Sequence, residues 1–415
     1  MAEAERVEIG TVVRLGHEGD GIVETPDGLV YVPGALPGEH VARDGRDFTL
    51  GPTVSLDRRG AFLCPHFTRC GGCALQHMSD DLYRRWKARL IPDALATHGL
   101  AADIRPMIEA PRNSRRRAVL TVRRDGREIV VGFHAPRSHE LVAIEQCAVL
   151  TPAIVAGLGA VRAMSRFLLT PKGDARVTVI DTPHGLDLAF ETPRPDLTPD
   201  ALRALTAAAD SHRLARVSTG GEVLLRRAHP VLAMAGVDVV PPPGAFLQAT
   251  VETEQALQGL VAAATAKAKR VADLFAGIGT LTFAIARRAQ VEAIDSERPL
   301  LDALIAAARH AQGLKPVTTR VRDLVRDPLS PRELDAYDAV VFDPPRAGAK
   351  EQAVALAKSK VKTIVAVSCN PGTLARDLAL LVEGGYRIAH VTPIDQFLFT
   401  PHIEAVAVLT RPGKR

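Results

Sequence analysis

Two short apolar segments, each followed by a proline-containing tetrapeptide, constrain the fold of this chain more than any other feature. Residues 339–342 read Ala-Val-Val-Phe and precede Asp-Pro-Pro-Arg at 343–346, and residues 363–367 read Thr-Ile-Val-Ala-Val and precede Ser-Cys-Asn-Pro at 368–371. Short runs of this kind, rich in β-branched residues, predict buried strands. In an open parallel α/β sheet, ligands bind beyond the carboxyl ends of the strands. We therefore expect the two tetrapeptides to face one pocket.

The free cysteine of the second tetrapeptide, Cys369, is the candidate nucleophile of that pocket. Pro371 has a fixed φ angle and restricts Asn370 before it, so the turn that presents the thiol is rigid. A free cysteine is more often a small buried hydrophobic residue. On the tetrapeptide alone, that alternative stays open.

Composition narrows the class of protein. The chain has 415 residues, of which 47% are hydrophobic and 24% charged, which predicts a soluble globular protein of two or three domains. The net charge of +5 permits a polyanionic partner without requiring one. The first residues lack the apolar stretch of a signal peptide, and the most apolar windows carry charges such as Asp273. We expect a cytoplasmic monomer with no membrane partner.

Residues 1–57 predict a small β-barrel. They are rich in strand-forming residues between glycines, and Pro-Asp-Gly at 26–28 and Pro-Gly-Glu at 37–39 are turn sequences. Four or five strands are expected. Barrels of this size often bind oligonucleotides, although the fold alone does not establish binding.

Four of the five cysteines form a separate pattern. Cys64, Cys70 and Cys73 follow the spacing C-x5-C-x2-C, and Cys147 lies further along the chain. Zinc sites usually take their ligands from two short knuckles, whereas three clustered thiolates and one remote thiolate are a common way to hold a [4Fe-4S] cluster. The two glycines between Cys70 and Cys73 let the chain wrap closely around a bulky ligand. We expect an iron-sulfur cluster rather than zinc, and four unrelated buried thiols are the alternative.

Residues 58–240 are expected to form a central α+β domain that carries this cluster. Residues 112–127 contain seven arginines in sixteen positions, on a predicted hairpin. Because the guanidinium group matches phosphate geometry, this segment predicts an RNA-binding face, with a solvated charged hairpin as the alternative. Pro-Pro-Pro-Gly at 241–244 marks the next boundary.

Residues 241–415 alternate between β and α patterns. One predicted strand runs from Val271 into the glycine turn Gly277-Ile-Gly279, and the next strand ends at Asp295. A glycine turn admits close approach by a nucleotide, and the later acid can bind ribose hydroxyls. The third glycine of the dinucleotide fingerprint is missing, which favours an adenosyl ligand. S-adenosylmethionine fits this pattern best, with Asp323 placed to reach the adenine edge.

Several motifs are similar to those of a known family. They are Val-Pro-Gly-Ala-Leu-Pro-Gly-Glu at 32–39, Cys-Gly-Gly-Cys-Ala-Leu-Gln-His at 70–77, Phe-Leu-Gln at 246–248, the two tetrapeptides, and Asp-Gln-Phe-Leu-Phe-Thr-Pro-His-Ile-Glu at 395–404. The chain resembles the S-adenosylmethionine-dependent RNA uracil-5-methyltransferases, and its order of modules is similar to the iron-sulfur branch that modifies 23S ribosomal RNA. It departs from the family pattern at Thr250, where asparagine is usual, and at Leu398, where proline is usual.

The resemblance implies an α/β fold in which a Rossmann-like class I methyltransferase domain at 241–415 follows a TRAM-like barrel and the cluster-bearing α+β domain. It implies methylation of carbon 5 of a uridine in RNA. Cys369 would add to carbon 6 of the base, and Glu404 would remove the proton from carbon 5. Asp343 would bond the uracil edge, and Arg346 would stabilise the enolate or hold phosphate. The S-adenosylmethionine site would be lined by Gln248, Phe275, Thr280, Asp295, Asp323 and Asp343.

Three alternatives stay open at this point. Amino-methylating enzymes carry an aromatic residue at the position of Arg346, which argues against that class. Transfer RNA is the rival substrate, and the barrel and the cysteine cluster favour 23S ribosomal RNA by analogy only. A non-catalytic iron-sulfur RNA-binding protein is the third alternative, but such a protein would not require Cys369 and Glu404 together.

Overall fold

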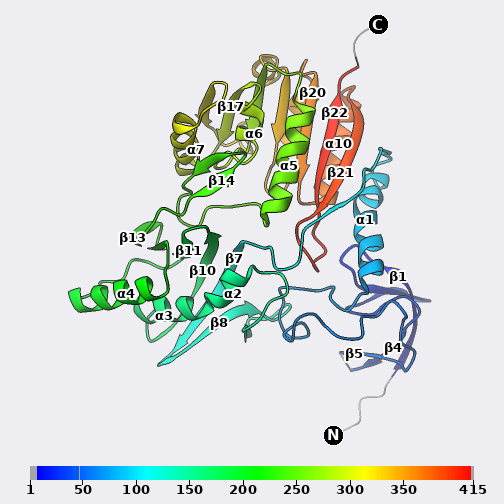
Figure 1. The fold of residues 1–415 in the computed structure, drawn as a ribbon. Coiled ribbons are helices and arrows are strands. Elements are labelled where there is room, and N and C mark those ends of the chain that lie inside the picture. The colour runs from blue at the N-terminus through cyan, green and yellow to red at the C-terminus, as the bar shows by residue number, and fades with distance from the viewer. Residues whose placement is uncertain (1–6, 46, 413–415) are drawn as a thin grey trace.

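The computed structural model describes residues 7–45 and 47–412. Three sheets carry most of the chain: an N-terminal sheet, a central sheet and a larger C-terminal sheet. In Figure 1 the C-terminal sheet lies above the other two, which sit on opposite sides below it. In the described part of the chain, every helix is too short or too polar to cross a bilayer.

The N-terminal sheet has five antiparallel strands in the order β3-β2-β1-β4-β5, as the glycine-punctuated sequence predicted. Valines from successive strands fill a small core on one face. Its two outer strands are not bonded to each other, so the described sheet is an open half-barrel. The strands are β1 (Val7–Leu15), β2 (Gly21–Thr25), β3 (Gly28–Val32), β4 (His40–Asp44) and β5 (Asp47–Leu50).

The cysteine-rich segment and helix α1 (Asp80–Ala96) come next. Ser79 caps α1 by accepting a hydrogen bond from the backbone N–H of Leu82 at 3.2 Å, as helix N-caps typically do. Figure 1 shows α1 standing between the half-barrel and the C-terminal sheet. Trp86 of α1 donates its indole N–H to the carbonyl of Gly16 at 2.9 Å. The same helix packs on α10 (Pro371–Glu383) in one hydrophobic core, so it joins the two sheets.

The central sheet has the order β13-β12-β11-β10-β7-β8-β9, with all neighbours antiparallel except β11 and β12. Three helices pack against its core, which agrees with the α+β prediction. The strands are β7 (Arg117–Asp125), β8 (Glu128–His134), β9 (Leu141–Ala143), β10 (Lys172–Thr182), β11 (Gly185–Phe190), β12 (Arg216–Thr219) and β13 (Glu222–Arg226). The helices are α2 (Pro152–Ala156), α3 (Leu158–Leu168) and α4 (Pro199–Ser211).

The C-terminal sheet has the order β18-β17-β16-β19-β20-β22-β21-β6. Strands β16 to β20 are parallel, and β22 is antiparallel to both of its neighbours, as the apolar run after Glu404 predicted. The edge strand β6 (Ile108–Glu109) comes from the segment after α1. The other strands are β16 (Arg270–Leu274), β17 (Gln290–Asp295), β18 (Val317–Val321), β19 (Ala339–Phe342), β20 (Thr363–Ser368), β21 (Arg387–Asp395) and β22 (Glu404–Thr410).

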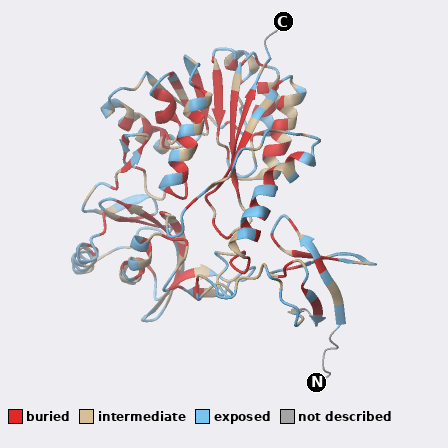
Figure 2. Cartoon of the chain, turned by 45° about the vertical axis from the view of Figure 1, so that its right-hand side comes forward, coloured by how far each residue is buried: buried red, intermediate tan, exposed pale blue. Residues whose placement is uncertain are grey.

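Helices cover both faces of this sheet, which explains why its middle strands are apolar along their whole length. Figure 2 shows these strands buried while the outer faces of the surrounding helices are exposed. A hairpin of β14 (Leu232–Met234) and β15 (Val237–Val239) packs beside them. The helices are α5 (Val251–Ala264), α6 (Thr282–Ala286), α7 (Arg298–His310), α8 (Pro331–Leu334), α9 (Lys350–Ala357) and α10.

A fully buried ion pair fastens α1 to the end of β21. The ammonium group of Lys87 lies 2.7 Å from Oδ1 of Asp395, and both side chains have no exposed surface. Tyr83 donates its hydroxyl to Oδ2 of Asp395 at 2.5 Å and accepts the backbone N–H of Phe399 at 3.0 Å. Lys87 also donates to the carbonyl of His402. Helix α1 therefore holds both ends of the loop 396–403.

We expect Lys87→Met to destabilise the protein strongly, because it leaves the carboxylate of Asp395 buried without its cation. Removing one partner of a buried ion pair typically costs about 3–5 kcal/mol. The midpoint of urea unfolding, followed by circular dichroism, measures the loss. Arg89→Met is the matched control, since it removes an exposed ion pair to Asp93 on the same helix and is expected to leave the midpoint unchanged. Equal midpoints for the two variants would contradict the assignment.

Candidate active site

Cys369 lies at the carboxyl end of β20, on the turn that begins α10. Asn370 caps this helix: its side-chain oxygen accepts the backbone N–H of Gly372 at 3.0 Å. Ser368 steadies the other side of the turn, because its hydroxyl accepts the N–H of Asn370 at 3.2 Å. The thiol is half-buried. The local sequence thus forms the rigid turn that the tetrapeptide predicted.

Two carboxylates lie beside this thiol. Asp343 follows β19, the parallel neighbour of β20. Glu404 begins β22, and since β22 runs antiparallel to β20 with Ser368 opposite Ala405, its first residue arrives at the end of β20. Glu404 is only 3% exposed. Side chains from three neighbouring strands, two parallel and one antiparallel, therefore meet at one edge of the sheet.

A chain of buried amides joins the two carboxylates. Gln248 donates from Nε2 to Oδ2 of Asp343 at 3.1 Å. Gln396 donates from its own Nε2 to Oε1 of Gln248 and to Oε2 of Glu404, both at 2.8 Å. The other oxygen of Glu404, Oε1, is buried and has no hydrogen-bond partner. One acceptor in this site is therefore left without a partner.

Burial raises the pKa values of all three groups, and neighbouring carboxylates add to the shift at Glu404 and Cys369. Burial raises the pKa of Asp343 to about 7. Burial first, and then the charge of Asp343, raises the pKa of Glu404 well above its usual range, while the bond from Gln396 opposes the shift. Burial, followed by the charges of Glu404 and Asp343, raises the pKa of Cys369 to about 11, and the guanidinium of Arg346 opposes it. Groups tuned in this way can exchange protons within one site.

The residues predicted to bind an adenosyl group surround the ends of β16, β17 and β18. Phe275 follows β16 with a φ of 61°, a strained conformation for a residue with a side chain. Gly277 comes next but one, and an added Cβ there would meet nothing within 4 Å, so its backbone faces open space. Asp295 accepts the N–H groups of Gly277 and Glu297, both at 2.9 Å. These features fit a ligand that lies against the backbone of the turn.

Two other predicted residues lie further along the chain, in different settings. Thr280 follows the turn at the start of the segment that leads into α6, and its carbonyl accepts a bond from Gln258 at 3.1 Å. Asp323 is exposed after β18, and its Oδ1 accepts the N–H groups of Val325 and Arg326, both at 3.1 Å. The second oxygen of Asp323, Oδ2, has one contact, an exposed ion pair with the Arg326 side chain at 3.6 Å.

A groove of about 950 Å³ leads away from Cys369. One wall is the half-barrel and the other is α1, with Tyr31 and Trp86 among the lining residues. Cations outnumber acids along it. The arginines are Arg14, Arg85, Arg89 and Arg346, and the acids are Glu18 and Asp93. The groove therefore offers a positive surface and the exposed ring of Tyr31.

The four remaining cysteines are Cys64, Cys70 and Cys73 on the loop at 64–73 and Cys147, and their charges influence one another. Burial raises the pKa of Cys73 to about 12, and the charges of Cys147, Cys70 and Cys64 add to the shift. Backbone N–H groups point at two of the sulfurs, at 3.4 Å to Cys70 and at 3.4 and 3.5 Å to Cys147. Four thiols that interact in this way, with N–H donors to sulfur, fit the donor chemistry of an iron-sulfur cluster.

Within residues 7–45 and 47–412, no group of three or more His, Cys, Asp or Glu side chains could hold a metal ion. A single zinc ion would draw each thiolate sulfur to about 2.3 Å from itself. The predicted cluster at Cys64, Cys70, Cys73 and Cys147 therefore stays a prediction.

The cysteine loop also contacts the loop 396–403. The backbone N–H groups of Ala74 and Leu75 both donate to the carbonyl of Phe399, at 2.8 and 3.0 Å. Phe399 has a φ of 59°, a strained conformation that the surrounding bonds maintain. The segment that follows Cys73 thus supports the loop that leads into Glu404.

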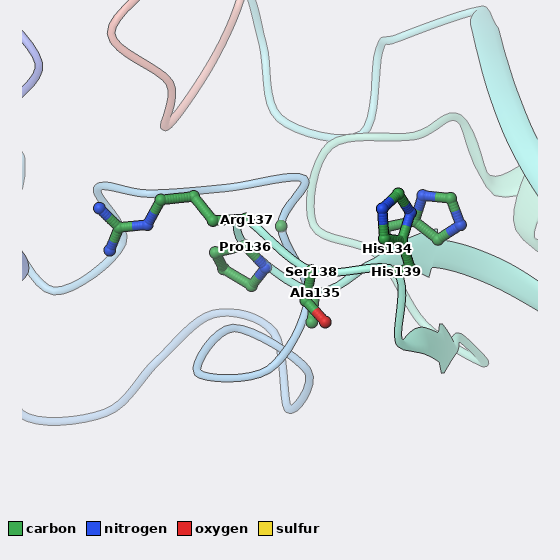
Figure 3. Close-up of a pocket in the computed structure, with 7 residues that line it drawn as sticks. His134, Ala135, Pro136, Arg137, Ser138 and His139 are labelled. Carbon is green, nitrogen blue, oxygen red and sulfur yellow. The ribbon is translucent and has the colours of Figure 1, made fainter.

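A second hollow, of about 470 Å³, lies beside the cysteine loop. It is lined by Gly71 and the turn 134–139. Figure 3 shows the rings of His134 and His139 side by side, while Arg137 points away from them. None of the predicted catalytic or adenosyl-binding residues lines it.

The predicted hairpin at 112–127 is confirmed by the antiparallel pairing of β7 and β8, while its role as an RNA-binding face stays a prediction. Arg116 is buried in an ion pair with a glutamate of α5. Arg117 and Arg124 donate to backbone carbonyls, and Arg115 lies over an aromatic ring of the loop 396–403. The guanidinium groups of these four arginines are used in contacts within the protein. The segment therefore has fewer free cations than its count of arginines suggests.

Gln396 is the residue of this site that sequence analysis missed. It lies inside the motif at 395–404, but an uncharged amide in a motif gives no chemical signal by itself. The one indication in the sequence that Gln396 belongs to the site was its position next to Asp395 of that motif. Only the fold shows that it bonds both Gln248 and Glu404.

Comparison with known proteins gives one family and relatives that match nearly the whole chain. A family model described as tRNA (Uracil-5-)-methyltransferase matches residues 242–412. An RNA methyltransferase of Brucella suis is 46% identical over 97% of each chain. The 23S rRNA (uracil(1939)-C(5))-methyltransferase RlmD of Chromohalobacter salexigens is 33% identical over 98% of this chain and 90% of its own.

A solved structure is similar in fold. The tRNA (uracil-54, C5)-methyltransferase of Pyrococcus abyssi, in complex with S-adenosyl-L-homocysteine, superposes with a TM-score of 0.74 over 97% of this chain and 99% of its own. The sequence identity is 21%, so this likeness concerns the fold. It supports a mixed α/β architecture of the class I methyltransferase type with an N-terminal half-barrel.

The raised pKa of Cys369 predicts slow alkylation by iodoacetamide at neutral pH. Because a higher pKa means less thiolate, the labelling rate should still rise above pH 9.0, the ordinary value for a thiol. At the alkaline end of the profile, where Glu404 is ionised, Glu404→Gln removes a negative neighbour and should speed labelling of Cys369, whereas Arg346→Met removes a positive one and should slow it. Peptide mass spectrometry separates Cys369 from the other thiols. Shifts of the same sign in both variants would contradict the electrostatic account.

Proposed function

The chain belongs to the RNA uracil-5-methyltransferase family, and from that premise we propose that it methylates carbon 5 of a specific uridine in RNA through a covalent adduct on Cys369. The observation that carries this proposal is the meeting of one thiol and two carboxylates at the ends of β19, β20 and β22. A thiol alone could be structural. A thiol beside a buried carboxylate with an unpaired oxygen has the two groups that addition and proton removal require.

The chemistry follows from these groups. Bound S-adenosylmethionine supplies the methyl group as a sulfonium. The Cys369 thiolate adds to carbon 6 of the uracil, and the electron pair of the double bond moves to make carbon 5 nucleophilic toward that methyl group. Oε1 of Glu404 then takes the proton from carbon 5, the double bond re-forms, and the thiolate leaves. Asp343 bonds the uracil edge and Arg346 stabilises the negative charge of the enolate.

The adenosyl ligand is assigned to the turn after β16 and the ends of the next strands. Gly277 leaves the backbone open to the ligand. Asp295 is placed for the ribose hydroxyls and Asp323 for the adenine edge. Gln248 bonds Asp343, and Asp343 lies close enough to Cys369 to raise its pKa, which supports a methyl donor held beside the base. Phe275 and Thr280 complete the proposed set.

RNA is assigned to the groove between the half-barrel and α1. Its arginines suit phosphates, and the exposed ring of Tyr31 offers a face for a base that has left its stack. The target uridine must be extruded to reach Cys369. This supports an RNA-binding part at 1–57, a central part at 58–240 and a catalytic part at 241–415. Similarity to the 23S enzyme over almost the whole chain favours 23S ribosomal RNA, with transfer RNA as the alternative.

A [4Fe-4S] cluster is assigned to Cys64, Cys70, Cys73 and Cys147. The supporting observations are the mutual influence of the four thiols and the N–H donors to their sulfurs. When bound, such a cluster would cross-link the loop at 64–73 to Cys147. Since Ala74 and Leu75 hold Phe399, that cross-link would keep the loop before Glu404 in place.

The proposed reaction predicts labelled 5-methyluridine in RNA incubated with the protein and methyl-labelled S-adenosylmethionine. Nucleoside mass spectrometry on 23S ribosomal RNA and on transfer RNA, treated separately, identifies product and substrate together. Cys369→Ala should abolish the product while leaving the melting temperature close to that of the wild type. Full activity of that variant would rule out the covalent mechanism, and label in transfer RNA alone would change the substrate.

The proposed cluster predicts about four iron and four sulfide ions per chain after purification without oxygen. Cys73→Ser should lose most of both, because it removes one of four ligands. Cys369→Ala is the matched control and should keep them, since Cys369 lies outside the group. Zinc without sulfide in the wild-type protein would favour the zinc alternative instead.

A further inference from the structure

Gln396 is buried in the centre of the candidate active site, with 1% of its surface exposed. Every polar atom of its side chain is bonded. Nε2 donates to Oε1 of Gln248 and to Oε2 of Glu404, both at 2.8 Å. Oε1 accepts the backbone N–H of Ala249 at 2.9 Å and lies 3.4 Å from the hydroxyl of Thr253. The amide therefore has four partners and little freedom to move.

The backbone of Ala249 determines which way this amide points. An N–H group can only donate, so it requires the oxygen of Gln396 and not the nitrogen. A flipped amide would set its own N–H against that of Ala249 and its oxygen against the carboxylate of Glu404. Both contacts would be repulsive. The NH2 group is thus held toward Glu404 and Gln248.

We propose that Gln396 is a positioning residue for methyl transfer: its amide holds Oε2 of Glu404, which leaves Oε1, the oxygen without a partner, to take the proton from carbon 5. This inference rests on the proposed function and extends it to a residue that makes no contact with the reacting atoms. The open Oε1 is the second observation behind it, because a buried carboxylate oxygen without a bond is costly unless it serves a ligand.

The electrostatics of the site explain why Glu404 needs this donor. Burial and the nearby charge of Asp343 both favour the protonated carboxyl group, which cannot accept a proton. A hydrogen bond to the carboxylate favours the ionised form and works against these two effects. The same NH2 group orients Gln248, whose Nε2 bonds Asp343 at 3.1 Å. Gln396 thus stands between the two acids: it bonds Glu404, the proposed base, directly, and it reaches Asp343 only through Gln248.

The test is Gln396→Met, which keeps the length of the side chain and removes its donors. The expected result is slow proton removal after normal methyl transfer. A methylated Cys369-RNA adduct should then accumulate as a labelled band that survives denaturing electrophoresis, while turnover at neutral pH falls at least about tenfold. Because the pKa of Glu404 rises without the donor, its ionisation needs higher pH. The acidic limb of the kcat profile should therefore move upward.

Gln352→Met is the matched control. Gln352 is another glutamine with 1% exposure, and it bonds the backbone N–H and carbonyl of Leu329 beside α9. Its loss leaves the same kind of unsatisfied backbone group but touches none of the acids. It should lower the melting temperature without an adduct and without a shift in the pH profile.

The outcomes separate the inference from the function. The positioning role is supported if the labelled adduct and the upward shift of the acidic limb of the kcat profile occur in Gln396→Met and not in Gln352→Met. A wild-type profile, or loss of methyl transfer with no labelled adduct, overturns that role while the proposed function stands. A wild-type protein that forms no 5-methyluridine in either RNA overturns the proposed function, and the inference with it.

Discussion

The antiparallel placement of β22 between β20 and β21 is the constraint on which the rest of the site depends. Parallel strands deliver their carboxyl ends to one edge of a sheet, which accounts for Asp343 and Cys369. An antiparallel strand delivers its first residue to that same edge. With Ser368 opposite Ala405, Glu404 starts its strand where β20 ends. A slip of one residue in this register would turn the Glu404 side chain to the other face of the sheet.

Bringing two acids and a thiol together in a buried place carries an electrostatic cost, and the structure offsets it with amides rather than cations. Gln248 and Gln396 bridge Asp343 and Glu404 without neutralising either of them. The acids keep raised pKa values and stay able to exchange protons. A buried arginine or lysine at the same place would hold them ionised. Neutral donors therefore suit a site in which protons must move.

The loop between β21 and β22 receives its support from outside the C-terminal sheet. Helix α1 holds it because Lys87 and Tyr83 bond Asp395 at the end of β21. The cysteine segment holds it through backbone bonds to Phe399. Residues near the start of the chain thus fasten the segment that leads into Glu404. This arrangement explains why α1 shares a hydrophobic core with α10 and why β6 adds an edge to the catalytic sheet.

The amino-acid sequence by itself determined the strands at 339–342 and 363–367, the turn at Cys369 and the helix after it, because hydrophobic periodicity and proline chemistry act over a few residues. It also placed Asp343 and Glu404 next to strands. Only the tertiary structure decided that Gln396 bonds Glu404, that Lys87 pairs with Asp395 more than 300 positions away, and that the arginines at 115–117 turn inward. Such contacts depend on strand register and on the packing of distant segments. The number of charged residues in a segment does not reveal which partner each side chain meets. A run of arginines is therefore compatible with an exposed binding surface and with buried arginines that are paired inside the protein.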